Sequence, residues 1–449
     1  MRQRGLRVAV AAMVALAVTA GLAGSATGQS GGGGGGGEDL TATDVGVSPT
    51  EIRIGVIADT GSPIAPGLFQ GAVDGVEAWA EYMNKENGGL AGRKIVIDTY
   101  DSKLSADDAR NSIIEACGKD FAIIGTAALF VNNVDDLVGC ADTDGAATGL
   151  PDFPVVTTEQ VHQCSPVSYG VNPPIIDCST ADDNPQTYRG SLGATNYYLK
   201  KFGKNALHGT YVYPSDLKSA KNTQVPAFTA QQDAGIKQDS TFDVSGRAPQ
   251  SDYTPIVQSM KDNGATYARH GGNDAGIIAL RKEAKIQGVN TVKVWDCSLQ
   301  CYDKDLVSSE NAADTEGQFV WVPFVPFEES KQVPMTAKFL KYIGRDKADG
   351  FSVQAFASGL ILTELVDNAI AAGGDAALTR KAVLGEAPKL TSFNAEGMFG
   401  DVNIGDRVPS PCYALMQIKS AKFVRVHPKK AGTLDCDPKN IYTQKTNLS

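Results

Sequence analysis

Short apolar strands alternate with longer amphipathic helices along the chain from about residue 51. Residues 52–58 form a β-branched apolar run that ends in a turn of Asp, Thr and Gly, which is typical of a buried parallel strand. Residues 68–89 carry apolar side chains at helical spacing and end in Asn-Gly-Gly, a helix C-terminal signal. This order predicts a parallel sheet with helices on both faces. The alternation continues with a strand expected over 93–101, a helix over 105–117 that Ser105 caps, and strands over 121–126 and 153–158.

A second α/β unit of similar size follows an irregular Cys- and Pro-rich stretch at 161–185. The last hundred residues do not make a third domain on their own, so we expect them to add to the two lobes already built. A chain that crosses between two lobes more than once forms a hinge with a cleft, where ligands are commonly held. The elements expected after residue 185 are helices at 188–203, 225–235, 252–264, 275–288, 334–344, 351–372 and 377–385, and strands at 208–214, 266–272, 291–296 and within 412–427.

The first fifty residues predict an export signal followed by a tether. Three arginines within the first seven residues precede an apolar run and then small residues, the pattern of a secretory signal peptide over 1–26. A transmembrane anchor is the alternative, but an anchor usually needs about 20 apolar residues and this run is shorter. Residues 27–49 include seven consecutive glycines and predict a flexible leader. We find no later stretch that looks long and apolar enough to span a membrane, and expect an exported protein, periplasmic or at the cell surface or extracellular.

Composition and motifs narrow the function. The net charge of −10 argues against a nucleic-acid partner, whose phosphates require a positive surface. The four histidines are scattered, and the sequence has neither a Gly-x-Ser-x-Gly elbow nor a phosphate-cradling glycine loop. We therefore expect no enzymatic activity, no metal and no cofactor.

Eight cysteines fall in pairs that are close in the sequence, which favours an oxidising compartment and disulfides. Eight cysteines allow 105 connectivities, so local pairing is an expectation from spacing alone. A zinc site at 297–301 is the alternative for one pair, but no second cysteine pair or histidine cluster lies near it. The expected disulfide cysteines are Cys117 with Cys140, Cys164 with Cys178, Cys297 with Cys301, and Cys412 with Cys436.

The stretch 51–101 resembles the opening of the branched-chain amino-acid (leucine/isoleucine/valine) class of type I periplasmic binding proteins of ABC transporters. The likeness lies in a first strand that ends in a Thr-Gly turn, a long helix that ends in Asn-Gly-Gly, and a second strand that opens with Gly-Arg-Lys-Ile. Later stretches agree with the same class in order: the strands at 121–126 and 153–158, the helix-to-strand step at 277–296, and the tail at 393–426.

This resemblance implies an α/β fold of two Rossmann-like lobes with parallel sheets, joined by a three-strand hinge. It implies a protein that closes on a small polar ligand (an amino acid, amide or short carboxylate) and delivers it to the permease of an ABC importer, and we expect a monomer. Many relatives carry a lipid-anchoring cysteine where this chain has Ser25. The implied boundaries are 50–182 plus 322–390 for lobe one, 183–321 plus 391–437 for lobe two, and 438–449 for a C-terminal tail.

The resemblance also implies ligand contacts in loops at the carboxyl ends of strands. The loop after the third strand lacks the hydroxyl residues that the family often has there, and an aromatic expected after the strand at 266–272 is replaced by an asparagine. The position of the cleft is thus retained while its chemistry differs, so a branched-chain amino acid is not the favoured ligand. The residues implied as ligand-binding are Ser62, Ala128, Leu129, Thr157, Thr158, Glu159, Lys218, Asn273 and Asp296.

Each of these residues has a simpler alternative role. Thr157 and Thr158 are also suited to ending a strand and capping a turn, and Asn273 to capping the helix at 275–288. Glu159 fits a solvated loop acid, and Asp296 a turn acid beside a disulfide. Two functional alternatives also stay open: a sensor domain that presents its ligand to a membrane receptor, and a secreted α/β hydrolase, against which the missing nucleophile motifs argue.

Overall fold

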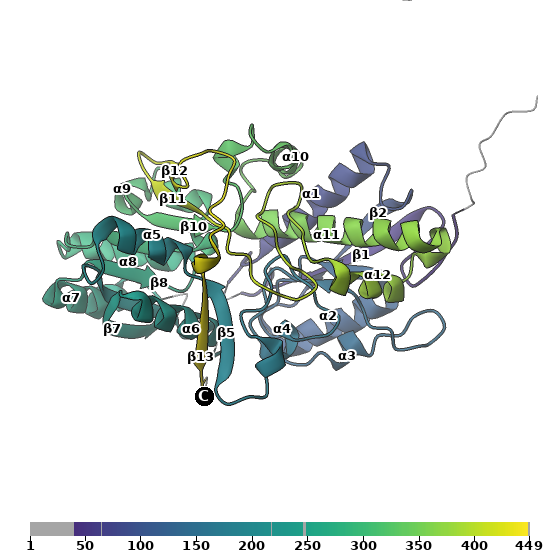
Figure 1. The fold of residues 1–449 in the computed structure, drawn as a ribbon, viewed down its shortest axis with the longest axis horizontal. Coiled ribbons are helices and arrows are strands. Elements are labelled where there is room, and N and C mark those ends of the chain that lie inside the picture. The colour runs from purple at the N-terminus through teal and green to yellow at the C-terminus, as the bar shows by residue number, and fades with distance from the viewer. Residues whose placement is uncertain (1–39, 64, 217, 246–247, 448–449) are drawn as a thin grey trace, which may run out of the picture. The chain divides into compact units, whose positions relative to one another are not determined.

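The computed structural model describes residues 40–449 except 64, 217, 246–247 and 448–449 (Figure 1). The signal peptide expected over 1–26, and residues 27–39 of the expected leader, lie outside the described residues. Residues 40–49 of that leader contact the folded part. The Nη2 group of Arg93 donates to the carbonyl oxygen of Thr41 at 2.8 Å, and Val47 is buried.

The strands in the described part of the chain form three sheets (Figure 1). The first is a parallel sheet in the order β2-β1-β3-β4. Alternate residues of β1 face opposite sides: Ile54 and Val56 join the core under helices α1 and α11, and Ile57 joins the core under α2. The bounds are β1 Glu51–Ala58, α1 Gln70–Glu86, β2 Lys94–Asp101, α2 Ala106–Lys119, β3 Ala122–Ile124, α3 Asp135–Val138, β4 Asp152–Phe153, α4 Gln160–Gln163, α10 Pro334–Ile343, α11 Gly350–Gly373 and α12 Arg380–Glu386.

The second sheet has the order β12-β11-β10-β9-β8-β6-β7, in which β11 runs antiparallel to both of its neighbours and all other neighbouring pairs are parallel. One face packs on α5 and α6 through a cluster rich in tyrosine, and the other packs on α7 and α8 through aliphatic side chains. The bounds are α5 Gly193–Phe202, β6 His208–Pro214, α6 Lys218–Ala234, β7 Lys237–Val244, α7 Thr254–Asn263, β8 Tyr267–His270, α8 Asp274–Ile286, β9 Val294–Cys297, α9 Ala312–Thr315, β10 Phe319–Val322, β11 Ala414–Ile418 and β12 Phe423–His427.

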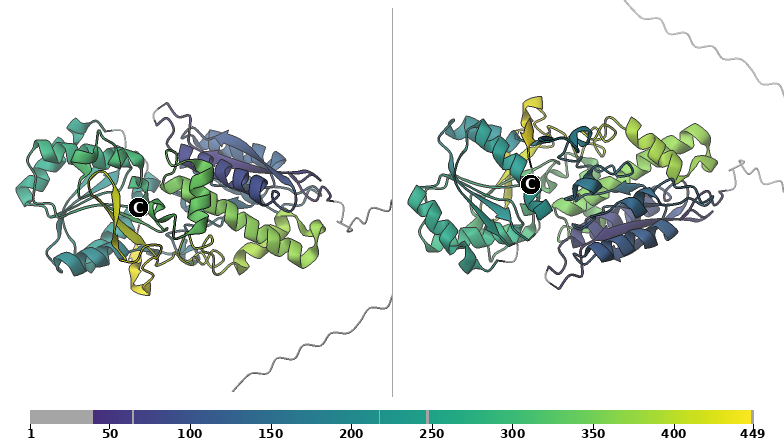
Figure 2. Two further views of the ribbon diagram at one scale, coloured as in Figure 1. Left: turned by 90° about the horizontal axis from the view of Figure 1, so that it is seen from above. Right: turned by 90° about the horizontal axis from the view of Figure 1, so that it is seen from below.

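The chain passes between these two sheets three times. It leaves the first sheet after α4, returns after β10 to place α10, α11 and α12 beside α1, and joins the second sheet again at β11. Figure 2 shows the consequence, since the late helices lie with the purple first strands on one side and the teal and green strands lie on the other. The expected two-lobed α/β fold, with added helices and strands from the last hundred residues, is confirmed.

Two strands form a separate antiparallel pair, β5 (Gln186–Ser191) with β13 (Ile441–Thr446). A helix was expected to begin at residue 188, which is wrong: residues 188–191 belong to β5, and the helix α5 starts only at Gly193. The partner strand lies within the segment expected as a C-terminal tail. Backbone pairing with β13 satisfies the N–H and C=O groups of β5, so tertiary contact decides the structure of this segment.

Helix α11 corrects one sequence expectation. Its 24 residues are long and apolar enough to span a membrane by length and composition. However, 61% of its most apolar window is buried inside the fold, and α1 packs along it. The ring of Trp79 lies where a side chain on Gly359 would be, 2.3 Å from an added Cβ, so this glycine permits the close approach of the two helices. The apolar side chains of α11 therefore belong to the core of the first lobe, as in a buried helix of a folded domain.

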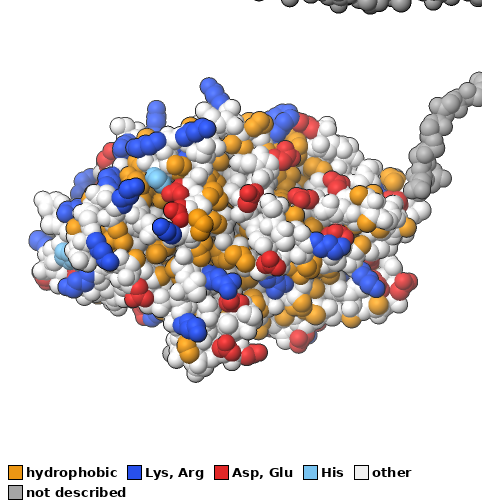
Figure 3. All heavy atoms as spheres, viewed as in Figure 1, with side chains coloured by type: hydrophobic (Ala, Val, Ile, Leu, Met, Phe, Trp, Pro, Cys, Tyr) orange, Lys and Arg blue, Asp and Glu red, His pale blue; other side chains and the backbone are white. Residues whose placement is uncertain are grey.

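Four disulfides join the cysteines of the described residues in the local pairing expected from their spacing: Cys117–Cys140, Cys164–Cys178, Cys297–Cys301 and Cys412–Cys436. On the face drawn in Figure 3, acidic and basic side chains are interspersed, without the continuous basic surface that nucleic-acid binding requires.

Candidate functional site

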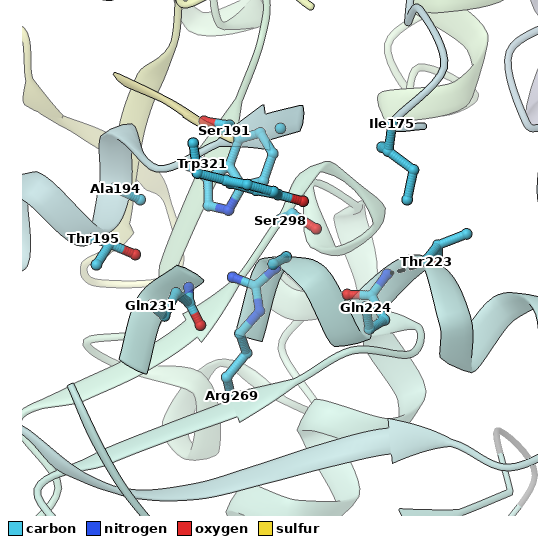
Figure 4. Close-up of a pocket in the computed structure, with 13 residues that line it drawn as sticks. Ile175, Ser191, Ala194, Thr195, Thr223, Gln224, Gln231, Arg269, Ser298 and Trp321 are labelled. Atoms are coloured by element: carbon cyan, nitrogen blue, oxygen red, sulfur yellow. Dashed lines mark hydrogen bonds between the residues drawn. The ribbon is translucent and has the colours of Figure 1, made fainter. Parts of the chain in front are cut away.

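A cavity of about 150 Å³ lies at the carboxyl end of β8, between the tyrosine-rich face of the second sheet and the β5–β13 pair (Figure 4). Water needs on the order of 10–15 Å³ of such space, so the cavity has room for roughly ten waters or a small molecule. Its walls come from β5, α5, α6, β8, β10 and β13. The lining residues are Ile175, Gly190, Ser191, Ala194, Thr195, Thr223, Gln224, Ala227, Gln231, Arg269, Ser298, Trp321 and Tyr442.

Arg269 provides the charge at this cavity. Its side chain rises from β8 between Gln231 and Gln224 toward Ser298 and Trp321 (Figure 4). Nη1 donates to Oδ2 of Asp296 on the neighbouring strand at 2.6 Å. Burial opposes the charge of the guanidinium, but the adjacent carboxylate outweighs this effect and raises the pKa of Arg269. The site therefore holds a permanent cation at its floor.

Asp296 is fully buried and has no free side toward the cavity. Besides Arg269, it accepts hydrogen bonds from the hydroxyls of Tyr198 at 2.8 Å and Tyr267 at 2.7 Å, and from the side-chain amide of Gln231 at 3.5 Å. Burial, reinforced by the Asp296 carboxylate, raises the pKa of both tyrosines far above its usual value, so their hydroxyls stay protonated donors. This acid holds Arg269 in place.

A second cavity of about 170 Å³ adjoins the first, and both contact Ile175 and Thr223. Its walls come from both sides of the chain crossing: Thr158 and Glu159 follow β4 of the first sheet, and Asn222 belongs to α6 on the second. Amide and hydroxyl side chains dominate the lining. The other members are Gln160, Gln163, Ile176, Gln186, Tyr188 and Ser219.

The residues implied as ligand-binding are distributed unevenly around these cavities. Thr158 and Glu159 line the second cavity, and Asp296 lies beneath the first. Lys218 is exposed at the start of α6, and Asn273 caps α8 by accepting a hydrogen bond from the Gly276 N–H at 3.1 Å. For Asn273 the structure thus shows the capping geometry of the simpler role.

The loops after β1 and β3 are joined by Asp59, which is buried. Its carboxylate accepts hydrogen bonds from the hydroxyl of Ser102 at 2.7 Å and from the Leu129 N–H at 2.8 Å. The carbonyl oxygen of Leu129 accepts a hydrogen bond from the Thr158 hydroxyl at 2.8 Å. Ser62 and Ala128 are buried in these loops and Thr157 is half-buried. None of Ser62, Ala128, Leu129 and Thr157 lines either cavity described above.

Sequence reasoning placed the site near the right strands but missed most of the side chains that line the first cavity. Arg269, Trp321 and Gln224 are not among the residues expected from the sequence to bind the ligand. The pairing of β8 with β9 is what would indicate a role for Arg269. Arg269 lies opposite Asp296 in this pair, so both side chains are on the face of the sheet that carries Tyr267. That pairing could not be seen without the strand order.

A third polar group lies elsewhere, at the start of α8. Carboxylate oxygens of Asp274, Asp303 and Asp305 lie within 4.8 Å of one another, the only such grouping found among the described residues. Burial, with a contribution from Asp303, raises the pKa of Asp274 to about 6. Repulsion from Asp303 and Asp305 contributes to this rise in the pKa of Asp274. Nothing else among the described residues at this site points to a metal.

Solved structures similar to this one are substrate-binding proteins. They include a branched-chain amino acid ABC transporter protein from Thermus thermophilus with bound valine (TM-score 0.67, 13% identity, 87% of this chain and 97% of that chain covered). A fatty acid ABC transporter substrate-binding protein from Thermomonospora curvata has a TM-score of 0.64 and 14% identity, with 87% and 97% covered. A leucine-binding protein from Thermotoga maritima has a TM-score of 0.61 and 15% identity, with 84% and 97% covered. At these identities the likeness establishes the fold.

No curated protein sequence matches the chain. Residues 51–422, in contrast, match the family profile described as periplasmic binding protein, which covers well over half of the sequence. The match begins at β1 and ends between β11 and β12, so it includes the first sheet, the second sheet apart from β12, and every crossing between them. The chain belongs to the periplasmic binding protein family.

Proposed function

We propose that this protein is an extracytoplasmic solute-binding protein, which closes on a small polar ligand and delivers it to the membrane permease of an ABC importer. The observation that carries the proposal is the second cavity, whose walls come from segments attached to both sheets. A ligand held there touches both lobes, so its binding energy favours the closed arrangement over the open one. Two of the similar proteins named above, from Thermus thermophilus and Thermomonospora curvata, belong to ABC transporters, which supports the importer role.

The surroundings of the cavities support binding without chemistry. Polar amides and hydroxyls, together with a single buried guanidinium, suit recognition of a ligand by hydrogen bonds. His162, the histidine nearest the second cavity, is buried and hydrogen-bonded to Asp152 at 2.8 Å, which gives it a structural role. We propose that the protein is exported with its signal peptide removed and acts as a monomer, which intact-mass measurement and light scattering of the secreted protein will test.

The first test is a thermal-shift screen of the purified protein against amino acids, amides, short-chain carboxylates and polyols. A ligand at a hundredfold excess over its Kd stabilises the folded state by about 2.7 kcal/mol. With an unfolding entropy of roughly 2 cal/mol/K per residue over about 400 residues, this corresponds to a rise in Tm of roughly 3 °C. A protein that no compound of these classes stabilises would contradict the proposed function.

A further inference from the structure

We propose that the ligand is a small carboxylate with no positively charged group, and that its carboxylate binds the guanidinium of Arg269 in the first cavity. This inference rests on the proposed function and specifies its substrate class: the two cavities adjoin at Ile175 and Thr223, so a ligand whose carboxylate binds Arg269 lies next to the second cavity. Four features carry it: an unused edge of the guanidinium, the charges around the cavity, the positions of the nearby acids, and the shape of the walls.

The guanidinium of Arg269 has a free edge. Its five N–H donors have a fixed planar arrangement, and Nη1 is directed to Asp296. Among the described residues, Nε has no hydrogen-bond partner although it is buried, and no hydrogen bond from Nη2 is found either. The Nε and Nη2 donors share one edge of the group, and two parallel N–H donors match the two oxygens of a carboxylate. A buried donor without a partner is unfavourable, so an acceptor supplied by the ligand is favoured here.

The charged residues around the first cavity favour a ligand with one negative charge. Arg269 is the only charged residue among the described residues that line it. The carboxylate of Asp296 pairs with Nη1 and also accepts hydrogen bonds from two tyrosine hydroxyls and an amide, so it leaves the Nε donor of Arg269 for an acceptor on the ligand. A dianion such as phosphate, in contrast, has no second cation here to balance it.

The same geometry disfavours an ammonium group. No acidic side chain lines the first cavity, and both oxygens of Asp296 already accept hydrogen bonds from below it. An α-amino group beside the carboxylate would therefore be desolvated without an acidic partner, which is costly in a buried site. The nearest acid among the lining residues is Glu159, which belongs to the second cavity.

The remaining walls suit an apolar body of modest size. The indole of Trp321 lies above Arg269 in Figure 4, and Ala194, Ala227 and Ile175 add aliphatic surface. Ser298 and Gln224 flank the guanidinium, where the Ser298 hydroxyl donates to Oε1 of Gln300 and the Gln224 amide donates to the Thr223 hydroxyl at 3.3 Å. A short aliphatic carboxylate therefore matches the cavity, because its carboxylate meets Arg269 and its hydrocarbon part meets the apolar walls.

The test uses three compounds with one carbon skeleton: 4-methylpentanoate, 4-methylpentanamide and leucine. Their affinities for the purified protein are measured by calorimetry, and tryptophan fluorescence, to which Trp321 contributes together with Trp79 and Trp295, provides a second readout. We expect 4-methylpentanoate to bind at least tenfold more tightly than either of the others, because the amide lacks the charge and leucine adds an unpaired ammonium. Straight-chain carboxylates of three to eight carbons, tested in parallel, define the length that fits.

The matched variants are Arg269→Gln and Arg281→Gln. Arg281 is also a buried arginine on the second lobe, but it donates to the carbonyl oxygens of Asp314 and Glu316, away from the cavity. We expect Arg269→Gln to weaken carboxylate binding roughly 10- to 100-fold and Arg281→Gln to leave it unchanged. Arg269→Lys, which keeps the charge but loses the two-donor edge, should fall between the two. Circular dichroism shows which variants are folded, and the comparison of the three compounds on the wild-type protein does not depend on them.

The outcomes separate the inference from the proposed function. Tighter binding of the amide, of leucine or of inorganic phosphate than of every carboxylate would overturn the inference and leave the solute-binding function in place. Carboxylate binding that is equally strong in folded Arg269→Gln would also overturn it. Failure of every compound class in both this test and the broader screen would overturn both.

Discussion

Asp120 provides a sensitive test of the electrostatic reasoning, because it is a buried acid far from the cavities. It follows α2, and its Oδ2 accepts a hydrogen bond from the hydroxyl of Tyr100 at 2.6 Å. Burial and the nearby Asp98 raise the pKa of Asp120 to about 7. Asp98 keeps its charge through ion pairs with Arg53 at 2.5 Å and Lys119 at 2.6 Å, so the proton of the pair resides on Asp120.

The perturbation is Asp120→Asn, which reproduces the protonated acid with an amide. The folded state holds this proton more tightly than the unfolded state, whose pKa is near the ordinary value of 3.8. The stability that Asp120 contributes is therefore fully present below about pH 3.8 and is lost as pH rises through about 7. At 1.36 kcal/mol per pKa unit, the rise from 3.8 to about 7 amounts to roughly 4 kcal/mol at most. We expect Asp120→Asn to match the wild type at pH 4 and to be more stable by about 2–4 kcal/mol at pH 8.

The assay is urea unfolding at pH 4, 6 and 8, followed by circular dichroism. The control is Asp107→Asn, which removes the same charge from an exposed position in the first turn of α2. This control should change stability by less than about 1 kcal/mol at every pH, since only a helix-terminus interaction is lost. A stability difference between Asp120→Asn and wild type that stays constant from pH 4 to pH 8 would refute the assignment of the raised pKa to Asp120.

Three further predictions concern packing and capping. Replacing both Cys117 and Cys140 by Ala opens a disulfide that closes a stretch of 23 residues, and should lower the free energy of unfolding by about 2–4 kcal/mol in calorimetry. Gly359→Ala places a methyl group against the ring of Trp79 and should cost at least about 1–3 kcal/mol, whereas an unchanged Tm would show that the two helices separate freely. Asn273→Ala removes the cap of α8 and should cost about 1 kcal/mol while ligand affinity stays the same; a loss of affinity above tenfold would instead give this residue a binding role.

The sequence predicted most strands of the two large sheets. β1 is a short apolar run, and β8 and β9 overlap stretches expected as strands although they carry Arg269, His270 and Asp296. β7 was missed because KQDSTFDV is mostly polar: it lies at the edge of the second sheet, so one side of it needs no apolar cover. β5 was taken for helix because its partner β13 lies some 250 residues away in the chain, beyond any local pattern.

The same limit applies to the candidate site. Loops at strand ends were predictable, because parallel sheets bind ligands there, and Thr158 and Glu159 do line a cavity. Asp296 was expected to bind the ligand because of the family resemblance. In this chain its oxygens are occupied by Arg269, Tyr198 and Tyr267. Which of two neighbouring charges faces the cavity depends on side-chain packing, which sequence spacing does not specify.

The contact between α12 and the first sheet has a consequence for the order of events during synthesis. Arg380 is fully buried and donates to the carbonyl oxygens of Cys117 and Ala141, so a residue made late in translation completes the surroundings of the first disulfide. Helix α11 likewise covers the face of β1 that bears Ile54 and Val56. The amino-terminal sheet therefore lacks part of its core until about 380 residues have been made. Contacts between residues far apart in the chain form slowly, so the nascent chain stays unfolded for longer. An unfolded chain is the form that can pass through a secretion channel.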